Sequence, residues 1–452
     1  MATLPPGPTS PRVVQLLRYT LRPLSYLEEC ARAYGDCFTL EFPRIPGTTQ
    51  RVPRMTFVLF SDPEAIREIF TGDGERLRAG DANSLFEHLL GRHSLLFMDG
   101  ERHLRERRMM QPPFHGERMQ AYGEVMRDIT DAVIDGWPLG RPFPIHAEMQ
   151  RITLEVILRT VFGVDQGPRL TRLRDLLTTG IPMGSKPWNI LFPIDLGPWS
   201  PGGRLARIGR EVDELLFSEI ARRRADGAGE RPDVLSMLVE ARDEQGHPMT
   251  DQELRDEMFT LLVGGHETTA TSLAWVFHRL LERPDVVGRV REELDRVVGR
   301  GPLAPAQVAQ LEYLDAVTKE TLRLNPILPA ISRHVAVPMR VGGHDLPAGV
   351  IATPCIYLAH RRPDLWPDAE RFQPERFVGA RPNPYVFFPF GGGVRRCLGA
   401  AFALYEMKVV LAETLRRISL RAAPGYQVRA VLRGVTLAPS AGMPVVAESL
   451  AA

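Results

Sequence analysis

A single cysteine, Cys397, lies in a setting suited to a large, flat ligand. It follows three consecutive glycines (391–393) and two arginines, Arg395 and Arg396, and a helical pattern begins just after Gly399. Glycines let the backbone turn tightly and come close to a partner. The positive end of a helix dipole favours the thiolate form of a cysteine placed ahead of it. A lone cysteine is nevertheless more often a buried apolar residue, so the surrounding string must decide between these interpretations.

The string around Cys397 has a longer regularity. Phe390, Gly393, Arg395, Cys397 and Gly399 stand at the spacing F-x-x-G-x-R-x-C-x-G. On this string the chain resembles the cytochromes P450, the haem-thiolate monooxygenases. The resemblance implies haem b (iron protoporphyrin IX) as cofactor and the Cys397 thiolate as axial iron ligand, which favours O–O cleavage. It also implies that Phe390, Gly393 and Gly399 bind the haem and that Arg395 pairs with a haem propionate.

A second candidate site lies in a long segment, 254–281, whose apolar middle contains GGHETT at positions 264–269. A helix that is apolar on every side is buried, and each glycine costs it about 1 kcal/mol relative to alanine. Thr268 follows Gly264 by four residues, so its hydroxyl can bond the Gly264 carbonyl and bend the helix. An ordinary buried contact between helices is the alternative.

The same string is similar to the P450 element [AG]-G-x-[DE]-T-[TS], which crosses the distal face of the haem. The resemblance implies that Thr268 delivers protons to dioxygen and that Glu267 is its acidic partner. It also makes Val263 and Gly264 candidates for the substrate pocket. His266 fills an unconstrained position in the family element, and no role is assigned to it.

Three further residues match positions that bind haem propionates in the family. His103 and Arg107 are four residues apart in a charged segment, so they share one face of a predicted helix. Such charged runs are usually solvated faces, which is the alternative. The resemblance implies instead that His103, Arg107 and the later Arg333 contact the propionates.

Glu320 and Arg323 are three residues apart on a predicted helix, 311–324, where a pair alone contributes only tenths of a kcal/mol. The family's E-x-x-R motif has a third member in a P-E-R-F string, which Arg376 supplies here. The resemblance implies that the three residues form a buried structural triad. Removing one partner would strand a buried charge at a cost of roughly 3–5 kcal/mol.

The other candidates for the substrate pocket are apolar. They lie in an irregular segment, 80–98, after the predicted helix 311–324, and in a predicted C-terminal hairpin: Leu95, Leu96, Ile327, Leu328, Ile331 and Val435. Core packing is the alternative for each. The segment 178–203 contains five prolines and cannot be one regular helix. Its apolar residues suit a mobile lid over an apolar pocket.

Periodicity predicts the elements that position these residues. Helices are expected over 23–34, 62–70, 99–107, 123–162, 170–177 and 207–224, and Thr250 with Glu253 forms a capping box ahead of the helix through 281. Strands are expected over 37–42, 54–60 and within 335–354. The fold class is therefore mainly α. The resemblance implies the P450 fold, a large helical domain with a smaller β-rich region and the haem between two long helices.

Composition limits the class of protein. The 452 residues are 44% hydrophobic and 25% charged, as in soluble globular proteins. No linker or repeat divides the chain, so one domain is expected over 1–452, with a lead-in over 1–22. A net charge of +1 gives no reason to expect nucleic acid or an anionic membrane as partner. No N-terminal apolar run approaches the roughly 20 residues of a bilayer span, so no membrane anchor is expected.

Two residue types bear on the source and location of the protein. The four cysteines lack the paired spacings of a zinc site or a disulfide scaffold, which favours a reducing cytoplasm. Only three of the 56 basic residues are lysines, which indicates a GC-rich bacterial genome.

The resemblance implies a monooxygenase that uses dioxygen to hydroxylate or epoxidise an apolar substrate, such as a fatty acid, terpenoid or polyketide-like molecule. The chain has no G-x-G-x-x-G after a strand and no iron–sulfur cysteine run, so an external ferredoxin and ferredoxin reductase must supply the electrons. A monomer is expected. Arginines near the thiolate side are candidates for the docking face: Arg102, Arg105, Arg108, Arg396, Arg416 and Arg417. Peroxide use, or haem sensing without catalysis, are the rival functions.

Overall fold

The computed structural model describes residues 4–44, 51–52, 55–116, 118–163, 167–184, 197, 199–227 and 231–449. Most of them are helical. The α-helices are α1 (Arg12–Leu21), α2 (Pro23–Tyr34), α3 (Pro63–Thr71), α4 (Ala79–Asn83), α5 (Glu87–Leu90), α6 (Gly100–Met110), α7 (Arg118–Ile134), α8 (Ile145–Thr160), α9 (Pro168–Gly184), α11 (Pro201–Asp226), α12 (Val234–Glu240), α13 (Asp251–Leu281), α14 (Pro284–Val297), α15 (Glu312–Leu324), α16 (Ile356–Ala359) and α17 (Ala400–Arg417).

Short 3-10 turns join several of these helices. They are η1 (Ser84–Phe86), η2 (Leu95–Phe97), η3 (Pro112–Phe114), η4 (Pro305–Gln310), η5 (Pro374–Phe377), η6 (Gly393–Arg395) and η7 (Ser440–Gly442). Three of them begin with proline, whose fixed φ suits the first position of a helical turn.

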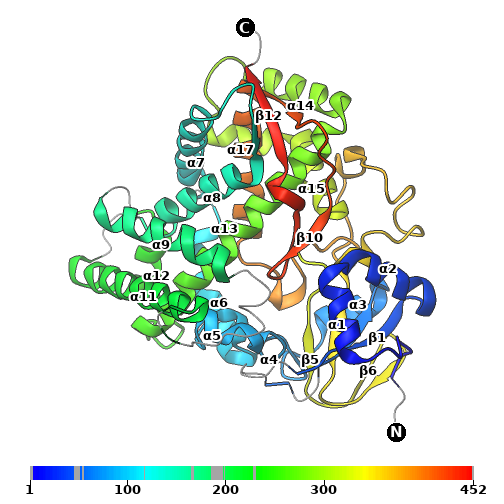
Figure 1. Cartoon of the computed structure of the whole chain (residues 1–452). Helices are drawn as coiled ribbons and strands as arrows, with labels where there is room; N and C mark the ends of the chain where they lie inside the picture. Colours follow the sequence, from blue (N-terminus) through cyan, green and yellow to red (C-terminus); the bar gives the residue numbers. More distant parts are fainter. Residues whose placement is uncertain are drawn as a thin grey trace.

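The strands are short and form small sheets. They are β1 (Cys37–Glu41), β2 (Thr56–Phe60), β3 (Leu77–Arg78), β4 (Pro142–Pro144), β5 (Arg333–Val335), β6 (Met339–Val341), β7 (His344–Leu346), β8 (Ile351–Pro354), β9 (Ile418–Ala422), β10 (Ala430–Arg433), β11 (Thr436–Pro439) and β12 (Pro444–Ser449). The largest sheet has the order β1-β2-β8-β5-β3, and β4-β12-β9 form a second; β6–β7 and β10–β11 are hairpins. The five-stranded sheet and α1–α3 form the N-terminal corner of the molecule (Figure 1).

Helix α13 is the central element of the helical region, and α8, α11, α15 and α17 pack against it (Figure 1). The predicted capping box opens it, because Thr250 accepts from the Glu253 N–H while the Glu253 side chain accepts from the Thr250 N–H. Many of its apolar side chains, such as those of Leu262 and Leu273, are fully buried, whereas Val263 is half-buried. The helix continues through Gly264 without a break, held at both ends by tertiary packing.

Two expected elements differ from the structure. The expected helix 123–162 is two helices, α7 and α8, separated by strand β4. Pro138 and Pro142 cannot donate backbone hydrogen bonds, and Gly140 adopts a φ of +70°, so the helix cannot continue between them. The segment 80–98, expected to be irregular, forms the short turns α4, η1, α5 and η2 instead.

The other expected helices and strands are confirmed within one to several residues at their ends. The lead-in contains helix α1, and Pro182 lies inside the last turn of α9. Most of the expected lid, 185–196 and 198, lies outside the described residues, as does residue 54 of the expected strand 54–60. Among the described residues, no helix is both long enough and apolar enough to cross a bilayer.

Candidate active site

The loop that carries Cys397 is fixed by its own backbone. The Cys397 N–H donates to the Phe390 carbonyl at 2.9 Å, and the Arg396 N–H donates to the Gly393 carbonyl at 3.1 Å. Gly393 has a φ of +62°, and a Cβ there would lie 2.0 Å from the Phe70 carbonyl oxygen of α3. Glycine is therefore required at this position by close approach to another part of the chain, which the sequence could not indicate.

Cys397 lies between this loop and α17. Its side chain keeps an exposed surface, yet burial among neighbouring groups raises the pKa of its thiol. The Gly399 N–H and the charges of Arg107 and Arg396 lower that pKa, as expected for a cysteine ahead of a helix. Burial has the larger effect on the pKa of this thiol. A coordinated metal ion would remove the thiol proton.

On α13, the Thr268 hydroxyl donates to the Gly264 carbonyl at 2.6 Å, which confirms the predicted bond. Gly264 is exposed, although Leu262 and His266 on the adjacent turns are buried. A Cβ at Gly264 would meet nothing within 4 Å, outside the backbone of its own helix. The helix thus presents a bare backbone surface, with a side-chain hydroxyl beside it, in an otherwise apolar element.

Glu267 precedes Thr268, but its carboxylate is buried against α8. Gln150 Nε2 donates to Glu267 Oε2 at 2.5 Å. Burial raises the pKa of Glu267, whereas the charge of Arg433 and the Gln150 bond lower it. The sequence analysis missed Gln150 and Arg433. The polar residues 146, 150 and 153 at helical spacing in an apolar segment were the signal that could have indicated this face of α8.

Three arginine side chains lie close to His103 on α6. Arg107, Arg333 and Arg395 each lower the pKa of His103, which burial and these charges bring to about 3. Arg333 is itself buried, and burial with the charge of Arg395 lowers its pKa to about 10. Neither Arg107 nor Arg333 pairs with a carboxylate in the part of the chain that the structure describes. Buried guanidinium groups without acidic partners are suited to binding anionic groups.

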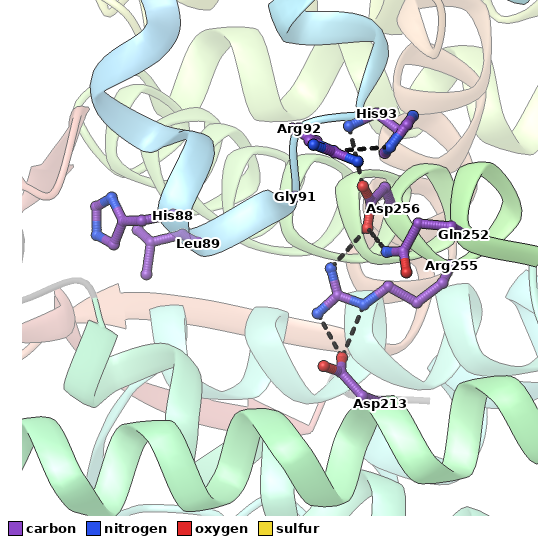
Figure 2. A pocket seen from close by; sticks show the side chains of 9 residues that line it. All are labelled: His88, Leu89, Gly91, Arg92, His93, Asp213, Gln252, Arg255 and Asp256. Atoms are coloured by element: carbon purple, nitrogen blue, oxygen red, sulfur yellow. Dashed lines mark hydrogen bonds and ion pairs between the residues drawn. The ribbon is translucent and has the colours of Figure 1, made fainter. Parts of the chain in front are cut away.

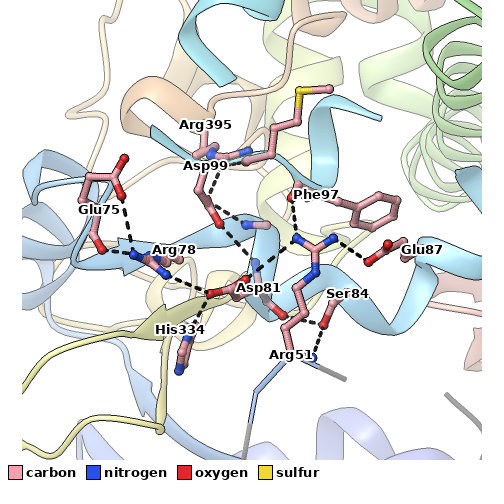
Figure 3. Close-up of polar contacts among 12 residues, drawn as sticks. Arg51, Glu75, Arg78, Asp81, Ser84, Glu87, Phe97, Asp99, His334 and Arg395 are labelled. Carbon is pink, nitrogen blue, oxygen red and sulfur yellow. Dashed lines mark hydrogen bonds and ion pairs between the residues drawn. The ribbon is translucent and has the colours of Figure 1, made fainter. Parts of the chain in front are cut away.

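Arg395, the third of these arginines, has a partner that the sequence analysis did not identify. It contacts the Asp99 carboxylate, and its Nη1 donates to the Leu95 carbonyl at 3.0 Å (Figure 3). Asp99 also accepts from the N–H groups of Gly80 at 2.9 Å and Asp81 at 3.2 Å. Arg395 therefore joins the Cys397 loop to the start of α6, in addition to lying near His103.

Comparisons with known proteins identify the family. A model of the family described as Cytochrome P450 matches residues 5–444. The chain belongs to the cytochrome P450 family. It is 42% identical over 448 residues to cytochrome P450 135B1 of Mycobacterium tuberculosis. The alignment spans 97% of this chain and 90% of the relative. Cytochrome P450 137 of the same organism is 34% identical over 447 residues, 97% of this chain and 90% of the relative.

Solved structures agree on the fold. Retinoic acid-bound cyanobacterial CYP120A1 matches with a TM-score of 0.84 at 25% identity, over 100% of both chains. The haem domain of cytochrome P450DA matches with a TM-score of 0.82 at 22% identity, over 99% of this chain and 97% of that chain. The predicted mainly α P450 fold is confirmed, and the protein is a haem-dependent P450 monooxygenase.

The residues of this P450 fit the cofactor of its family. Haem needs one axial ligand, an open planar surface on its other side, and partners for two carboxylates. The chain offers the accessible thiol of Cys397, the bare turn at Gly264, and two guanidinium groups that pair with no described carboxylate, at the half-buried Arg107 and the buried Arg333. Gly399, where a Cβ would also meet nothing within 4 Å, leaves room beside the thiol.

The expected substrate-pocket residues differ in burial and fall into three groups. Leu95 and Ile327 are buried in the core, at 9% and 8% exposure. Leu96 and Val435 are exposed, at 42% and 45%. Of the remaining four, Gly264 is exposed, and the other three are half-buried: Val263, Leu328 and Ile331. The exposed members alone present apolar surface that a ligand could cover without repacking the core.

A polar pocket of about 350 Å³ lies where the segment 80–98 is held against α13 (Figure 2). Arg255 donates to Asp213 at 2.7 Å and to Asp256 at 2.9 Å. Asp256 accepts from the His93 N–H at 2.9 Å, and a Cβ at Gly91 would lie 2.2 Å from its carboxylate. The pocket is therefore lined by ion pairs that anchor the segment bearing Leu95 and Leu96.

The expected triad residues lie together. Arg323 donates from Nε and Nη2 to the two oxygens of Glu320, both at 2.7 Å, and neither side chain is exposed. Arg376 Nε is 3.5 Å from Glu320 Oε1, and its side chain is 13% exposed. Arg376 also donates to the Asp368 carbonyl at 3.1 Å. The third member is thus closer to the surface than the first two.

The expected docking arginines are mostly engaged within the chain. Arg105 donates to Asp243 at 2.7 Å and Arg417 to Asp131 at 2.8 Å, and Arg108 pairs with Glu244 at 2.5 Å. Arg102 bonds His93, and Arg416 bonds backbone carbonyls near Gly299. Arg396 is exposed beside Cys397, and no ion pair of its side chain occurs within the described ranges. Of the six expected residues, Arg102 and Arg396 are exposed and have no acidic partner among the described residues.

A buried acid on α6 makes stability depend on pH. Burial, with the nearby Glu253, raises the pKa of Glu106 to about 7, although Arg105 contacts it. The folded state therefore binds more protons than the unfolded chain between about pH 4.5 and 7, and stability falls as pH rises through this window. Glu106→Gln should reduce the change in the free energy of unfolding across this pH window by about 3 kcal/mol. Urea unfolding at pH 5 and 8 measures it.

The matched control is Glu101→Gln, which changes an exposed acid of the same helix. It should leave the difference between pH 5 and pH 8 as in the wild type. A Glu106→Gln variant with the wild-type pH dependence would show that Glu106 is already ionised in the folded protein at low pH.

Proposed function

We propose that this P450 hydroxylates or epoxidises an apolar organic molecule of the fatty acid, terpenoid or polyketide class, with electrons from an external ferredoxin and its reductase. The observation that carries the oxygenase mechanism is the Thr268–Gly264 hydrogen bond next to the buried Glu267. The exposed apolar side chains of Leu96 and Val435 support an apolar substrate. CYP120A1, whose solved form contains retinoic acid, supports the terpenoid class within that range.

Each residue has a definite task in this proposal. Haem, when bound, supplies the activation of dioxygen. Cys397 holds the iron, and His103, Arg107, Arg333 and Arg395 hold the propionates.

Phe390, Gly393 and Gly399 shape the loop and first turn that would hold the porphyrin. Thr268 holds a proton at its hydroxyl, and Glu267 exchanges protons with the distal side. The triad of Glu320, Arg323 and Arg376 holds α15 and η5 together beneath this site.

The partners and the state of the protein follow the same proposal. Arg396, exposed beside Cys397, supports docking of an acidic ferredoxin on that side. We retain one domain over 1–452, a monomer and a cytoplasmic location as predictions. Analytical ultracentrifugation of the haem-loaded protein checks whether it is a monomer.

Reconstituted turnover tests the proposed function. With a bacterial ferredoxin, its reductase and NADPH, the wild type should incorporate one atom of ¹⁸O₂ into a bound fatty acid or terpenoid. Thr268→Ala should consume NADPH but release mostly hydrogen peroxide, with product falling about 10²-fold, since positioned proton transfer contributes about 10²–10⁴-fold. Ser272→Ala, one turn further along α13, is the control.

Two outcomes would contradict the proposal. Product formed from hydrogen peroxide alone, and unaffected by Thr268→Ala, would indicate a peroxide-using enzyme. Haem binding without turnover of any apolar substrate, under any partner, would indicate a sensor.

A further inference from the structure

A polar cluster surrounds the Glu267 carboxylate where α8 packs on α13. Gln150 Nε2 donates to Glu267 Oε2 at 2.5 Å. His146 lies one turn earlier on α8, with its Nε2 3.9 Å from Glu267 Oε1. Arg433, the last residue of β10, places its Nε 3.9 Å from the same oxygen. Three elements that are distant in sequence therefore converge on one acid.

The two ring nitrogens of His146 have different roles. Arg433 Nη1 lies 3.0 Å from His146 Nδ1, and a guanidinium group can only donate, so Nδ1 accepts. A neutral ring then carries its proton on Nε2, which lies 3.1 Å from Thr271 Oγ1. Burial, with the charge of Arg433, lowers the pKa of His146 to about 3, so the ring is neutral near pH 7. Arg433 thereby selects the tautomer whose N–H lies on the side of Glu267.

One oxygen of Glu267 has no partner of its own. Oε1 is buried and accepts no hydrogen bond from any residue that the structure describes. The two separations of 3.9 Å, to His146 and to Arg433, are too long for direct hydrogen bonds. This oxygen is the point at which a proton could reach the acid from the hairpin side.

The charges around Glu267 are few. His266, the preceding residue on α13, is buried with its pKa lowered to about 4, and its Nδ1 lies 2.9 Å from Thr153 Oγ1. His146 and His266 are thus both neutral near pH 7, and Gln150 is uncharged. Among the described groups close to the carboxylate, Arg433 carries the full positive charge. Its charge opposes the effect of burial on the pKa of Glu267.

Arg433 belongs to the hairpin β10–β11, whose turn also bears the exposed Val435. The hairpin is attached to α13, because Trp275 Nε1 donates to the Leu437 carbonyl at 2.8 Å. The Arg433 side chain is 32% exposed, so it extends from the surface of the hairpin to the buried acid. One short turn therefore connects a candidate substrate contact with the environment of Glu267.

We propose that Arg433 is a positioning residue for proton delivery: it fixes the Nε2–H tautomer of His146 and keeps the buried Glu267 able to ionise. The inference rests on the proposed function, because it takes Glu267 as the acid of the proton relay. Arg433 performs no chemical step and acts through Glu267 and His146.

Spectroscopy of the haem-loaded protein without substrate tests the proposal. In Arg433→Gln, the pKa of His146 should rise by about 1 unit or more because a neighbouring positive charge is removed. It is read by NMR of ¹³C-labelled histidine, assigned with His146→Gln. The pKa of Glu267 should rise similarly. It is read from the carboxyl stretch in pH-difference infrared spectra, assigned with Glu267→Gln. Arg433→Lys, which keeps the charge, should restore the Glu267 value.

Turnover supplies the second measurement. Arg433→Gln should release more hydrogen peroxide per NADPH than the wild type, with a larger solvent deuterium isotope effect on product formation, and Arg433→Lys should partly reverse both. The control is Arg429→Gln, an exposed arginine just before the same hairpin, which should behave as the wild type. If Arg433→Gln does not fold, Arg433→Lys is tested by itself. It keeps the positive charge, so the pKa of Glu267 must stay at the wild-type value.

Two results would overturn the inference. One is an unchanged titration of both His146 and Glu267 in Arg433→Gln. The other is a changed titration with the wild-type ratio of peroxide to product, which would make Arg433 structural only. Failure of the proposed function is separate, since it would appear in the wild type as product formed from hydrogen peroxide alone or as haem binding without turnover, and would leave the titrations readable.

Discussion

Cys397→Ala should lose the strongly red-shifted Soret band that the reduced wild type gives with carbon monoxide, and turnover should fall by more than about 10²-fold. Even removal of an outer partner of a metal ligand typically costs 10–100-fold, and this variant removes the proposed ligand itself. Alanine leaves no group at this position that could replace the sulfur. The absorption spectrum of the dithionite-reduced protein with carbon monoxide measures the effect.

Cys37→Ala is the matched control, because it removes a half-buried thiol of β1 that lies outside the site. It should keep the wild-type band and activity. A red-shifted band that survives in Cys397→Ala would show that another residue supplies the sulfur ligand. A band typical of histidine ligation in the wild type would remove the thiolate assignment altogether.

Glu320→Ala should lower the free energy of unfolding by about 3–5 kcal/mol. Arg323 would lose two charge-assisted bonds of 2.7 Å while its guanidinium stays fully buried. The carbonyls of His360 and Ala369, which accept from Arg323 Nη1, cannot balance its charge. Urea unfolding followed by circular dichroism, at equal haem content, measures the loss.

Two variants separate the triad from a general effect of lost charge. Glu312→Ala removes an exposed acid at the first turn of the same helix and should change stability by less than about 0.5 kcal/mol. Arg376→Ala should cost less than Glu320→Ala, because its side chain is partly exposed and 3.5 Å from Glu320. Equal losses for Arg376 and Glu320 would contradict the arrangement described above.

Local signals in the sequence were sufficient for the elements that carry them. The capping box at Thr250 and the hydroxyl bond from Thr268 depend on residues three or four positions apart, and both are confirmed. The family and its fold were likewise predictable from the spacing around Cys397. These features are encoded within short windows, so a pattern of residue types is enough to predict them.

The missed features depend on contacts between distant segments. Asp99 meets Arg395 across 296 positions, and Arg433 meets His146 across 287. The ion pairs of the expected docking arginines could not be predicted for the same reason, since the acidic partners of Arg105, Arg108 and Arg417 lie on other elements. The raised pKa of Cys397 also follows from burial, a tertiary property. No short pattern contains this information.

The Asp99–Arg395 pair has a consequence for how the cofactor is taken up. Around His103, which stays neutral near pH 7, three guanidinium groups carry three positive charges, and Asp99 cancels one of them. The surplus of two equals the charge of the two propionates that haem b brings. With both propionates bound here as proposed, uptake of the cofactor would leave this region electrically neutral, so neither an unbalanced cation nor an unbalanced anion would be buried. By this accounting Asp99, which need not touch the haem, adjusts the protein's charge to that of its cofactor.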